Sequence, residues 1–352
     1  NSGIFEYNSS AAQTLSGVIS GAGSVLKDNT GTLTLTANNN FSGGTTVDGG
    51  TLQLTVDGRI GNGGLTVNNG GTFSIANDDF NSLGGAITVN EGGTLSTDST
   101  GNNAHNIGAI TLNGGTLTSS GNTWFQGNWI FNGDVTVGGS ALSTISGLAV
   151  GSQPSGGTFN VDDSVAGAST DLLVSADITL GSLTKTGTGT MELTGANTYS
   201  GTTTVSAGTL ALNGAADNSR IAGDANTATF DVTISGGTLR NDANEQIADT
   251  ASITMSSGVY SLNGVTETID AFTNSGGTFT TGAGTLIGLG NTITWSGGTN
   301  TINDGGTVQD QHFDVSGGTN TVEGGATGGT LHVQSGGTGF EFTGTGTPNV
   351  TL

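Results

Sequence analysis

Cysteine is absent from the 352 residues of the chain, and proline occurs only twice. Without cysteine there is no disulfide framework, no thiolate metal site and no cysteine nucleophile. So little proline excludes a proline-rich linker and a collagen-type triple helix. No apolar run approaches the roughly 18 residues of a membrane-spanning helix, and the polar start Asn1-Ser2-Gly3 does not look like a secretory signal. We therefore expect no membrane insertion of this chain.

Basic residues are also scarce, with five against 27 acidic residues and a net charge of −22. So few cations cannot neutralise a row of phosphates, and we expect neither nucleic acid nor an anionic membrane as a partner. The acids are scattered along the chain, which is typical of solubilising charge on a folded surface. The five bases are Lys27, Arg59, Lys185, Arg220 and Arg240.

Glycine, by contrast, occupies 66 positions, and threonine is frequent as well. Both residue types weaken helices, so we predict an all-β chain. A Gly-Gly-Thr triplet recurs every 19–22 residues in two runs, at 49–51, 70–72, 92–94 and 114–116, and at 276–278, 297–299, 317–319 and 336–338. Two further copies lie between the runs, at 156–158 and 236–238. A fixed period of this length indicates a solenoid.

Each period contains the same succession of short strands and corners. An apolar–polar–apolar triplet such as Leu65-Thr66-Val67 comes first, and alternation such as Leu52-Gln53-Leu54 follows Gly-Gly-Thr. Alternation with period two indicates strands with one buried face, and glycine pairs indicate corners with positive φ. The side chains expected to point inward are Leu52, Leu54, Phe73, Ile75, Leu95, Leu117, Leu210 and Leu239.

Near-identical segments one period apart favour stacked parallel strands over a hairpin meander. The segments 296–302 and 316–322 differ only at their last residue, so stacking would place Asn300 and Asn320 in an amide ladder. We therefore predict a single-stranded parallel β-helix with rungs of about 19–22 residues. It would be continuous over residues 1–352.

The sequence also contains a second repeat that is longer than one rung. The block at 23–54 is similar to the block at 181–212, including Gly31-Thr-Leu-Thr-Leu-Thr36 against Gly189-Thr-Met-Glu-Leu-Thr194. Both blocks resemble the passenger-associated transport repeat, also called the autotransporter-associated β-strand repeat. The pattern of this repeat is G-T-L-x-L-T-G-x-N-x-Y-x-G-x-T-x-V-x-x-G-T-L-x-L. In the first block Phe41 stands in the tyrosine position, and there is an extra glycine pair.

The resemblance implies a right-handed parallel β-helix that is exported to the bacterial cell surface or beyond it. Such repeats occur in adhesins, proteases, toxins and matrix proteins, so they indicate a scaffold and an export route. No catalytic residue belongs to the motif. A complete autotransporter ends in a membrane β-barrel rich in alternating aromatic strands, and we expect none within residues 1–352.

We predict no catalytic, cofactor-binding or metal site, and no cofactor. The calcium-binding pattern G-G-x-G-x-D is absent, and the bases lie far apart in the sequence. The acid pairs Asp78-Asp79 and Asp162-Asp163 are expected at corners. His105 is expected in a solvated loop, and alignment of 313–315 with 331–333 puts His332, one rung after His312, beside Asp314 as a surface pair. The aromatic residues Trp124, Phe125, Trp129 and Phe131 are expected to pack in the core rather than to form a carbohydrate platform.

Two functions from different classes remain. The first, which we favour, is a non-enzymatic structural or adhesive protein of the cell surface or extracellular matrix, with cell-surface glycans as candidate partners. The second is a polysaccharide-acting β-helix enzyme of lyase or glycosidase type, or a carbohydrate-binding passenger domain. A groove with three convergent carboxylates and a base would favour the enzyme. The strand-like ends Ile4-Phe-Glu-Tyr7 and Asn349-Val-Thr-Leu352 also predict end-to-end self-association into filaments.

Overall fold

The computed structural model describes residues 2–55, 57–76, 82–97, 104–120, 128–147, 149–152, 157–165, 167, 169–215, 221, 231–289, 292–310, 313–324, 330–332, 340–344 and 349–351. The chain forms two compact units, Asn1–Gly181 (unit 1) and Ser182–Leu352 (unit 2). All regular structure in the described ranges is β-strand, so the all-β prediction is confirmed. None of these ranges contains a helix long and apolar enough to cross a membrane.

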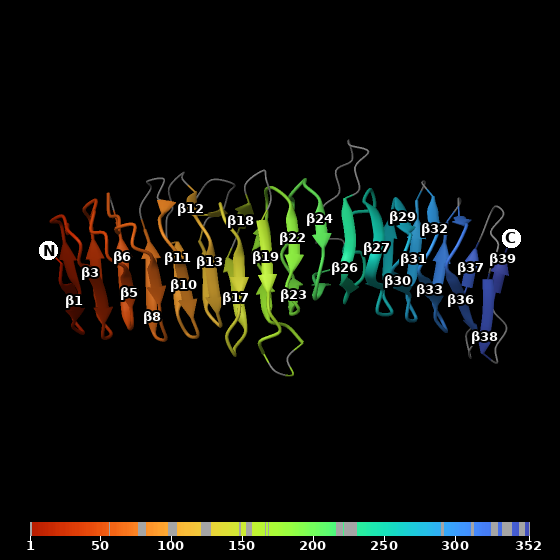
Figure 1. Ribbon diagram of the computed structural model, residues 1–352, viewed down its shortest axis with the longest axis horizontal. Helices are drawn as coiled ribbons and strands as arrows, with labels where there is room; N and C mark the ends of the chain where they lie inside the picture. Colours follow the sequence, from red (N-terminus) through yellow and green to blue (C-terminus); the bar gives the residue numbers. More distant parts are fainter. Residues whose placement is uncertain are drawn as a thin grey trace. The chain divides into compact units, whose positions relative to one another are not determined.

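Unit 1 is a parallel β-solenoid with three walls, each a row of strands that pair in parallel with the strands of neighbouring rungs (Figure 1). The first wall comprises β1(Ile4–Asn8), β3(Ser24–Asp28), β5(Thr45–Val47), β7(Leu65–Val67), β10(Ile87–Asn90), β13(Ile110–Asn113), β16(Val135–Val137) and β19(Gly157–Val161). The second wall comprises β2(Gln13–Leu15), β4(Thr32–Leu35), β6(Gly50–Leu54), β8(Gly71–Ile75), β11(Thr94–Thr97), β14(Thr116–Ser119), β17(Ser143–Gly147) and β20(Leu172–Val174). The third wall begins later, with β9(Ser82–Leu83), and continues with β12(His105–Ile107), β15(Trp129–Phe131), β18(Ala149–Ser152) and β21(Asp177–Ile178).

Unit 2 repeats the three-walled arrangement. The first wall contains β22(Leu183–Thr186), β24(Thr203–Val205), β29(Ala271–Asn274), β32(Ile293–Trp295) and β35(Phe313–Val315). The second wall contains β23(Thr190–Leu193), β25(Thr209–Leu212), β30(Thr278–Thr280), β33(Thr299–Ile302), β36(Thr319–Gly324) and β38(Phe340–Gly344). The long strands β26(Val232–Asn241) and β27(Ser252–Ser261) run through the corner and contribute to both walls. The third wall contains β28(Thr266–Ile269), β31(Thr285–Gly288), β34(Thr307–Gln309), β37(Thr330–His332) and β39(Asn349–Thr351).

The register follows the sequence period. Leu65 pairs with Ile87, which pairs with Ile110, so the apolar–polar–apolar triplets stack in line. The predicted parallel β-helix is thus confirmed for each unit, while its continuity over 1–352 stays a prediction. The predicted rung length of 19–22 residues is wrong for several rungs, because Leu117 pairs with Ile145, 28 residues on. Extra residues at the corners lengthen these rungs while the strand register is kept.

The glycine corners behave as the sequence predicts. Gly50 and Gly92 take φ values of 59° and 70°, in the left-handed region that glycine alone enters without strain. A Cβ on Gly50 would also lie 2.4 Å from the carbonyl oxygen of Gly31 in the preceding rung. Glycine is therefore required there by both conformation and space.

The core is the stack of inward residues along the walls. All eight side chains expected to point inward are at most 1% exposed, which confirms that part of the sequence analysis. The strands beside them carry outward threonines, and β10, for example, alternates buried and half-buried residues. Burial of this kind, repeated rung by rung, is what holds a solenoid together.

Candidate functional site

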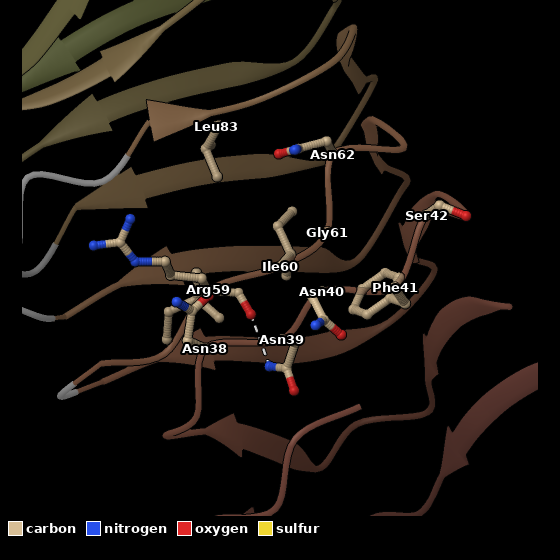
Figure 2. Close-up of a pocket in the computed structure, with 11 residues that line it drawn as sticks. Asn38, Asn39, Asn40, Phe41, Ser42, Arg59, Ile60, Gly61, Asn62 and Leu83 are labelled. Atoms are coloured by element: carbon tan, nitrogen blue, oxygen red, sulfur yellow. Dashed lines mark hydrogen bonds between the residues drawn. The ribbon is translucent and has the colours of Figure 1, made fainter. Parts of the chain in front are cut away.

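A pocket of about 580 Å³ opens in unit 1 at the start of the third wall (Figure 2). In the described residues of the preceding rungs, the strand pairing on this side of the solenoid is limited to an isolated bridge between Asn38 and Arg59. The wall proper starts at β9, whose one partner strand in the described structure is β12. The residues at 59–62 and Leu83 therefore lie on neighbouring rungs without being joined as paired strands, and the pocket lies between them.

The lining of the pocket combines polar and apolar side chains. The side chains of Phe41, Leu54, Ile60 and Leu83 line it and are at most 9% exposed. The polar lining residues Asn38, Asn40, Ser42 and Asn62 are exposed, and Arg59 is half-buried. The amide of Asn62 is directed toward Leu83 in Figure 2, across the space between the two rungs. The pocket thus offers hydrogen-bonding groups beside an apolar surface.

Asn39 lines the pocket, but its side-chain amide forms hydrogen bonds with backbone groups. Its Oδ1 accepts a hydrogen bond from the N–H of Ile19 at 2.8 Å, and its Nδ2 donates to the carbonyl oxygen of Arg59 at 2.7 Å and of Ala37 at 3.0 Å. One buried amide therefore links three successive rungs. It fixes the backbone from which the neighbouring polar side chains project.

Arg59 is the one charged residue among the eleven that line the pocket. Of the other described bases, Lys27 and Lys185 are buried, and Arg240 forms an ion pair with Asp242 at 2.7 Å. Arg220 lies outside the described residues.

Lys27 and Lys185 act as equivalent clamps in the two units. The Lys27 ammonium donates to the carbonyl oxygens of Asp28, Asn29 and Gly49 at 2.9, 2.7 and 2.8 Å. Both lysines are 0% exposed although each belongs to a strand of the first wall. Burial lowers the pKa of Lys27, against the opposing effect of Asp28. These contacts satisfy corner carbonyls of two rungs, so Lys27 ties the two rungs together.

The Lys185 clamp matches the first one contact for contact. Its ammonium donates to the carbonyl oxygens of Thr186, Gly187 and Ala207 at 2.7, 3.0 and 3.2 Å. Gly208 next to it takes a φ of 61°, and a Cβ there would lie 2.7 Å from the ammonium nitrogen. The sequence counted these lysines only as bases and did not predict their burial. The sequence pattern could have predicted this burial, because Lys27 lies two residues after the inward-pointing Val25 on the same strand.

An aromatic residue follows each clamp and marks one difference between the two units. In unit 2 the buried hydroxyl of Tyr199 hydrogen-bonds to Thr203 at 2.6 Å. Burial raises the pKa of Tyr199, so this phenol stays protonated. In unit 1 Phe41 occupies the same place, and the buried hydroxyl of Thr45, the counterpart of Thr203, has no hydrogen-bond partner.

Among the described residues of unit 2, three carboxyl side chains are buried, and Glu267 on β28 is buried most completely, with 0% exposed against 8% for Asp231 and 5% for Asp310. The backbone N–H groups of Gln246 and Ile247 donate to it at 2.8 and 3.1 Å, and the Asn241 amide also contacts it. Burial raises its pKa to about 8, although the two backbone N–H groups oppose the shift; Glu245 adds to it. Glu267 is therefore largely protonated at neutral pH.

The predicted asparagine ladder is confirmed and is longer than expected. Asn300 donates to Asn320 at 2.8 Å, and Asn274, which the sequence analysis did not include, donates to Asn300 at 2.7 Å. All three side chains are at most 2% exposed. Their amides point into the solenoid and bond from rung to rung, so the ladder is structural.

Two histidine predictions are wrong. His105 is fully buried because it lies on β12, a strand of the third wall, where its ring centroid packs 5.9 Å from that of Trp129 on the next strand. His332 lies on β37 of the third wall and is aligned with Gln309, whereas Asp314 lies on the first wall. The proposed surface pair is therefore not formed between neighbouring strands. His312 lies outside the described residues.

The expectations for one aromatic pair and one acid pair agree with the structure. Trp129 and Phe131 are buried, as expected for core packing. Asp162 and Asp163 are exposed immediately after the end of β19, which is a corner position. Asp78, Asp79, Trp124 and Phe125 lie outside the described residues. Within the described part of the chain, no group of three His, Cys, Asp or Glu side chains could hold a metal ion.

The equivalence of the two lysine clamps coincides with a match to a known family. The model of the passenger-associated-transport-repeat matches residues 25–54 and 183–212, which contain Lys27 and Lys185 respectively. The chain contains two passenger-associated transport repeats. The resemblance described from the sequence is confirmed, and the Phe41–Tyr199 difference is a difference between two copies of one repeat.

The chain is also similar in sequence to one curated protein. The chain is 32% identical over 230 residues to the adhesin BmaC autotransporter of Brucella suis biovar 1 (strain 1330). These residues make up 64% of this chain and 5% of the adhesin, so the chain spans a small part of that relative's length. No solved structure shows significant similarity to the chain.

Proposed function

We propose that this chain is an extracellular, adhesive and non-enzymatic segment of a surface-displayed bacterial protein. The observation that carries the proposal is the pair of passenger-associated transport repeats, supported by similarity to an autotransporter that is named an adhesin. The role of the repeats is to build the solenoid that presents an adhesive surface. The chain's threonine-rich outer faces and net charge of −22 suit a protein exposed to water.

The pocket supports a binding role over the enzymatic alternative. A lyase or glycosidase needs carboxylates that converge with a base or with each other. The eleven lining residues include Arg59 and no carboxylate. Among its described lining residues, hydrogen-bonding groups that suit ligand recognition are present and a carboxylate is not, which supports a binding role.

Adhesion by the isolated chain tests the proposal directly. Beads coated with the folded chain are expected to adhere to cultured host cells above the level of albumin-coated beads, and coating with urea-denatured chain should abolish the difference. Equal adhesion of all three bead types would refute an adhesive role. Turnover of a polysaccharide that one carboxylate substitution abolishes would refute the non-enzymatic assignment.

End-to-end self-association is a separate proposal. Strand addition at the terminal rungs would be a head-to-tail contact that does not close. Sedimentation velocity of the 352-residue chain at rising micromolar concentrations is expected to show larger species. A chain that stays monomeric throughout would contradict it.

A further inference from the structure

Six asparagines in the chain are followed directly by glycine: Asn62, Asn69, Asn113, Asn132, Asn213 and Asn263. Such a pair is chemically labile, because glycine has no side chain to shield its backbone nitrogen from the amide of the preceding asparagine. All six pairs lie in the described part of the chain, so their surroundings can be compared. We propose that Asn62 is a site of spontaneous deamidation and that the fold protects the other five asparagines.

The reaction needs only the chain and water. The Gly63 nitrogen forms a bond to Cγ of Asn62 and gives up its proton, while the bond from Cγ to Nδ2 breaks and ammonia leaves. Water then opens the five-membered imide at one of its two carbonyl carbons, which yields either an aspartate or an isoaspartate. The amide has to turn and the nitrogen has to approach Cγ before the attack. A hydrogen bond that holds either group therefore slows the reaction.

Neither group is held at Asn62. Asn62 and Gly63 are exposed in a bend that precedes β7. Within the described part of the chain, neither the Asn62 amide nor the Gly63 N–H takes part in a hydrogen bond. The Asn62 side chain points toward Leu83 (Figure 2), and a Cβ on Gly84 would lie 2.6 Å from its Oδ1. Glycine at position 84 therefore leaves the space that the amide occupies.

Three of the other pairs are held at both groups. In each of them the asparagine amide donates to a side chain of a neighbouring rung, and the glycine N–H donates to a second acceptor. The amide acceptors are Asn90 at 3.0 Å for Asn113, Glu192 at 2.7 Å for Asn213 and Asp242 at 2.9 Å for Asn263. The acceptors of the glycine N–H groups are, in the same order, the Ser143 hydroxyl at 3.0 Å, the Gln246 amide oxygen at 2.8 Å and the Thr281 carbonyl oxygen at 3.1 Å.

The remaining two pairs are held at one group each. The Asn132 amide donates to Asn106 at 3.0 Å, and the N–H of the glycine after Asn69 donates to the carbonyl oxygen of Gly92 at 3.2 Å. Breaking one such bond slows a reaction by about two- to tenfold. We therefore expect Asn69 and Asn132 to react about two- to tenfold more slowly than Asn62, and the three doubly held asparagines to react more slowly still.

Modification of Asn62 would change the pocket that it lines. An aspartate adds a negative charge to the lining. An isoaspartate also lengthens the backbone by one carbon before Gly63, which is packed so closely that a Cβ there would lie 2.3 Å from the carbonyl oxygen of Gly43. The isoaspartate form should therefore loosen the contact between these two rungs, and the pocket would change with the age of the chain.

Incubation of the whole chain in mildly alkaline buffer made with heavy-oxygen water, followed by peptide mass spectrometry, measures the rate at each pair. Each deamidation incorporates one labelled oxygen, so modification before the experiment is not counted. In the folded chain Asn62 should react fastest. The same chain unfolded in guanidinium chloride is the control, because the six pairs share the same glycine and their rates should converge once the hydrogen bonds are lost.

Two variants test the physical cause. Asn62→Gln should remove the signal at that position and leave the other five rates unchanged. Asn106→Ala removes the acceptor of the Asn132 amide and should raise the rate at Asn132 by about two- to tenfold, with circular dichroism to exclude misfolding. The inference is overturned if another pair reacts as fast as Asn62 in the folded chain, if the ranking persists after unfolding, or if the rate at Asn132 does not rise.

Discussion

The same substitution should change stability in opposite directions in the two repeats. Thr203 hydrogen-bonds to Tyr199 at 2.6 Å, whereas in the other repeat Phe41 takes the place of the tyrosine and the buried hydroxyl of the equivalent Thr45 is unpartnered. Replacement by valine keeps the branched shape and removes the hydroxyl. We expect Thr45→Val to stabilise the protein and Thr203→Val to destabilise it.

The magnitudes follow from the state of each hydroxyl. Both threonines are at most 2% exposed, and a buried polar group without a hydrogen bond costs about 1–3 kcal/mol. Thr45→Val removes such a group, so the unfolding free energy should rise by about 1 kcal/mol. Thr203→Val leaves the Tyr199 hydroxyl without its partner and should cost about 1–3 kcal/mol.

Exchange of the aromatic residues provides the reciprocal test. Phe41→Tyr should supply the partner that Thr45 lacks and add about 0.5–1.5 kcal/mol, the net contribution of one hydrogen bond. Tyr199→Phe should cost about as much as Thr203→Val. The double variant Tyr199→Phe/Thr203→Val should recover most of the loss, since an apolar pair of similar shape needs no hydrogen bond.

Urea unfolding followed by far-UV circular dichroism measures the total change in each variant. Hydrogen–deuterium exchange of peptides covering 41–47 and 199–205 locates it, because rungs of a solenoid are stabilised mainly by their neighbours. Changes of the same sign for Thr45→Val and Thr203→Val would refute the reasoning. So would equal protection of the two peptides before and after Phe41→Tyr.

Three further variants test the clamp, the buried acid and the core. Lys185→Met leaves three corner carbonyls without their donor and should lower the unfolding free energy by about 1–3 kcal/mol. Urea unfolding should show this as a lower midpoint, and an unchanged midpoint would contradict the role of the lysine. For Glu267 the folded pKa of about 8 exceeds the ordinary value of 4.5, so the unfolding free energy of the native chain should fall by roughly 3–5 kcal/mol as pH rises between these two values, and Glu267→Gln should flatten that profile. Leu95→Asp buries a charge at a site that is 0% exposed and should abolish cooperative thermal unfolding, whereas the outward Thr94→Asp should leave the melting temperature nearly unchanged.

Periodicity was sufficient to predict the strands, the corners and the core. Alternation places Leu95 and Leu117 inward in any stack of parallel strands, and near-identical segments require Asn300 and Asn320 to stack. Both inferences depend only on residues within one rung and on the repeat length. Such local information is present in the sequence itself.

The structure alone decided what happens where the repeat is irregular. His105 looks like a loop residue, yet it is buried because the third wall covers that side of its rung. His332 and Asp314 have similar positions in the alternation but belong to different walls, and the lengths of the corners decide this. The pocket beside Arg59 exists because the third wall starts only at β9. Pairing between rungs is a non-local interaction, and no pattern within a single rung of this sequence records where it begins.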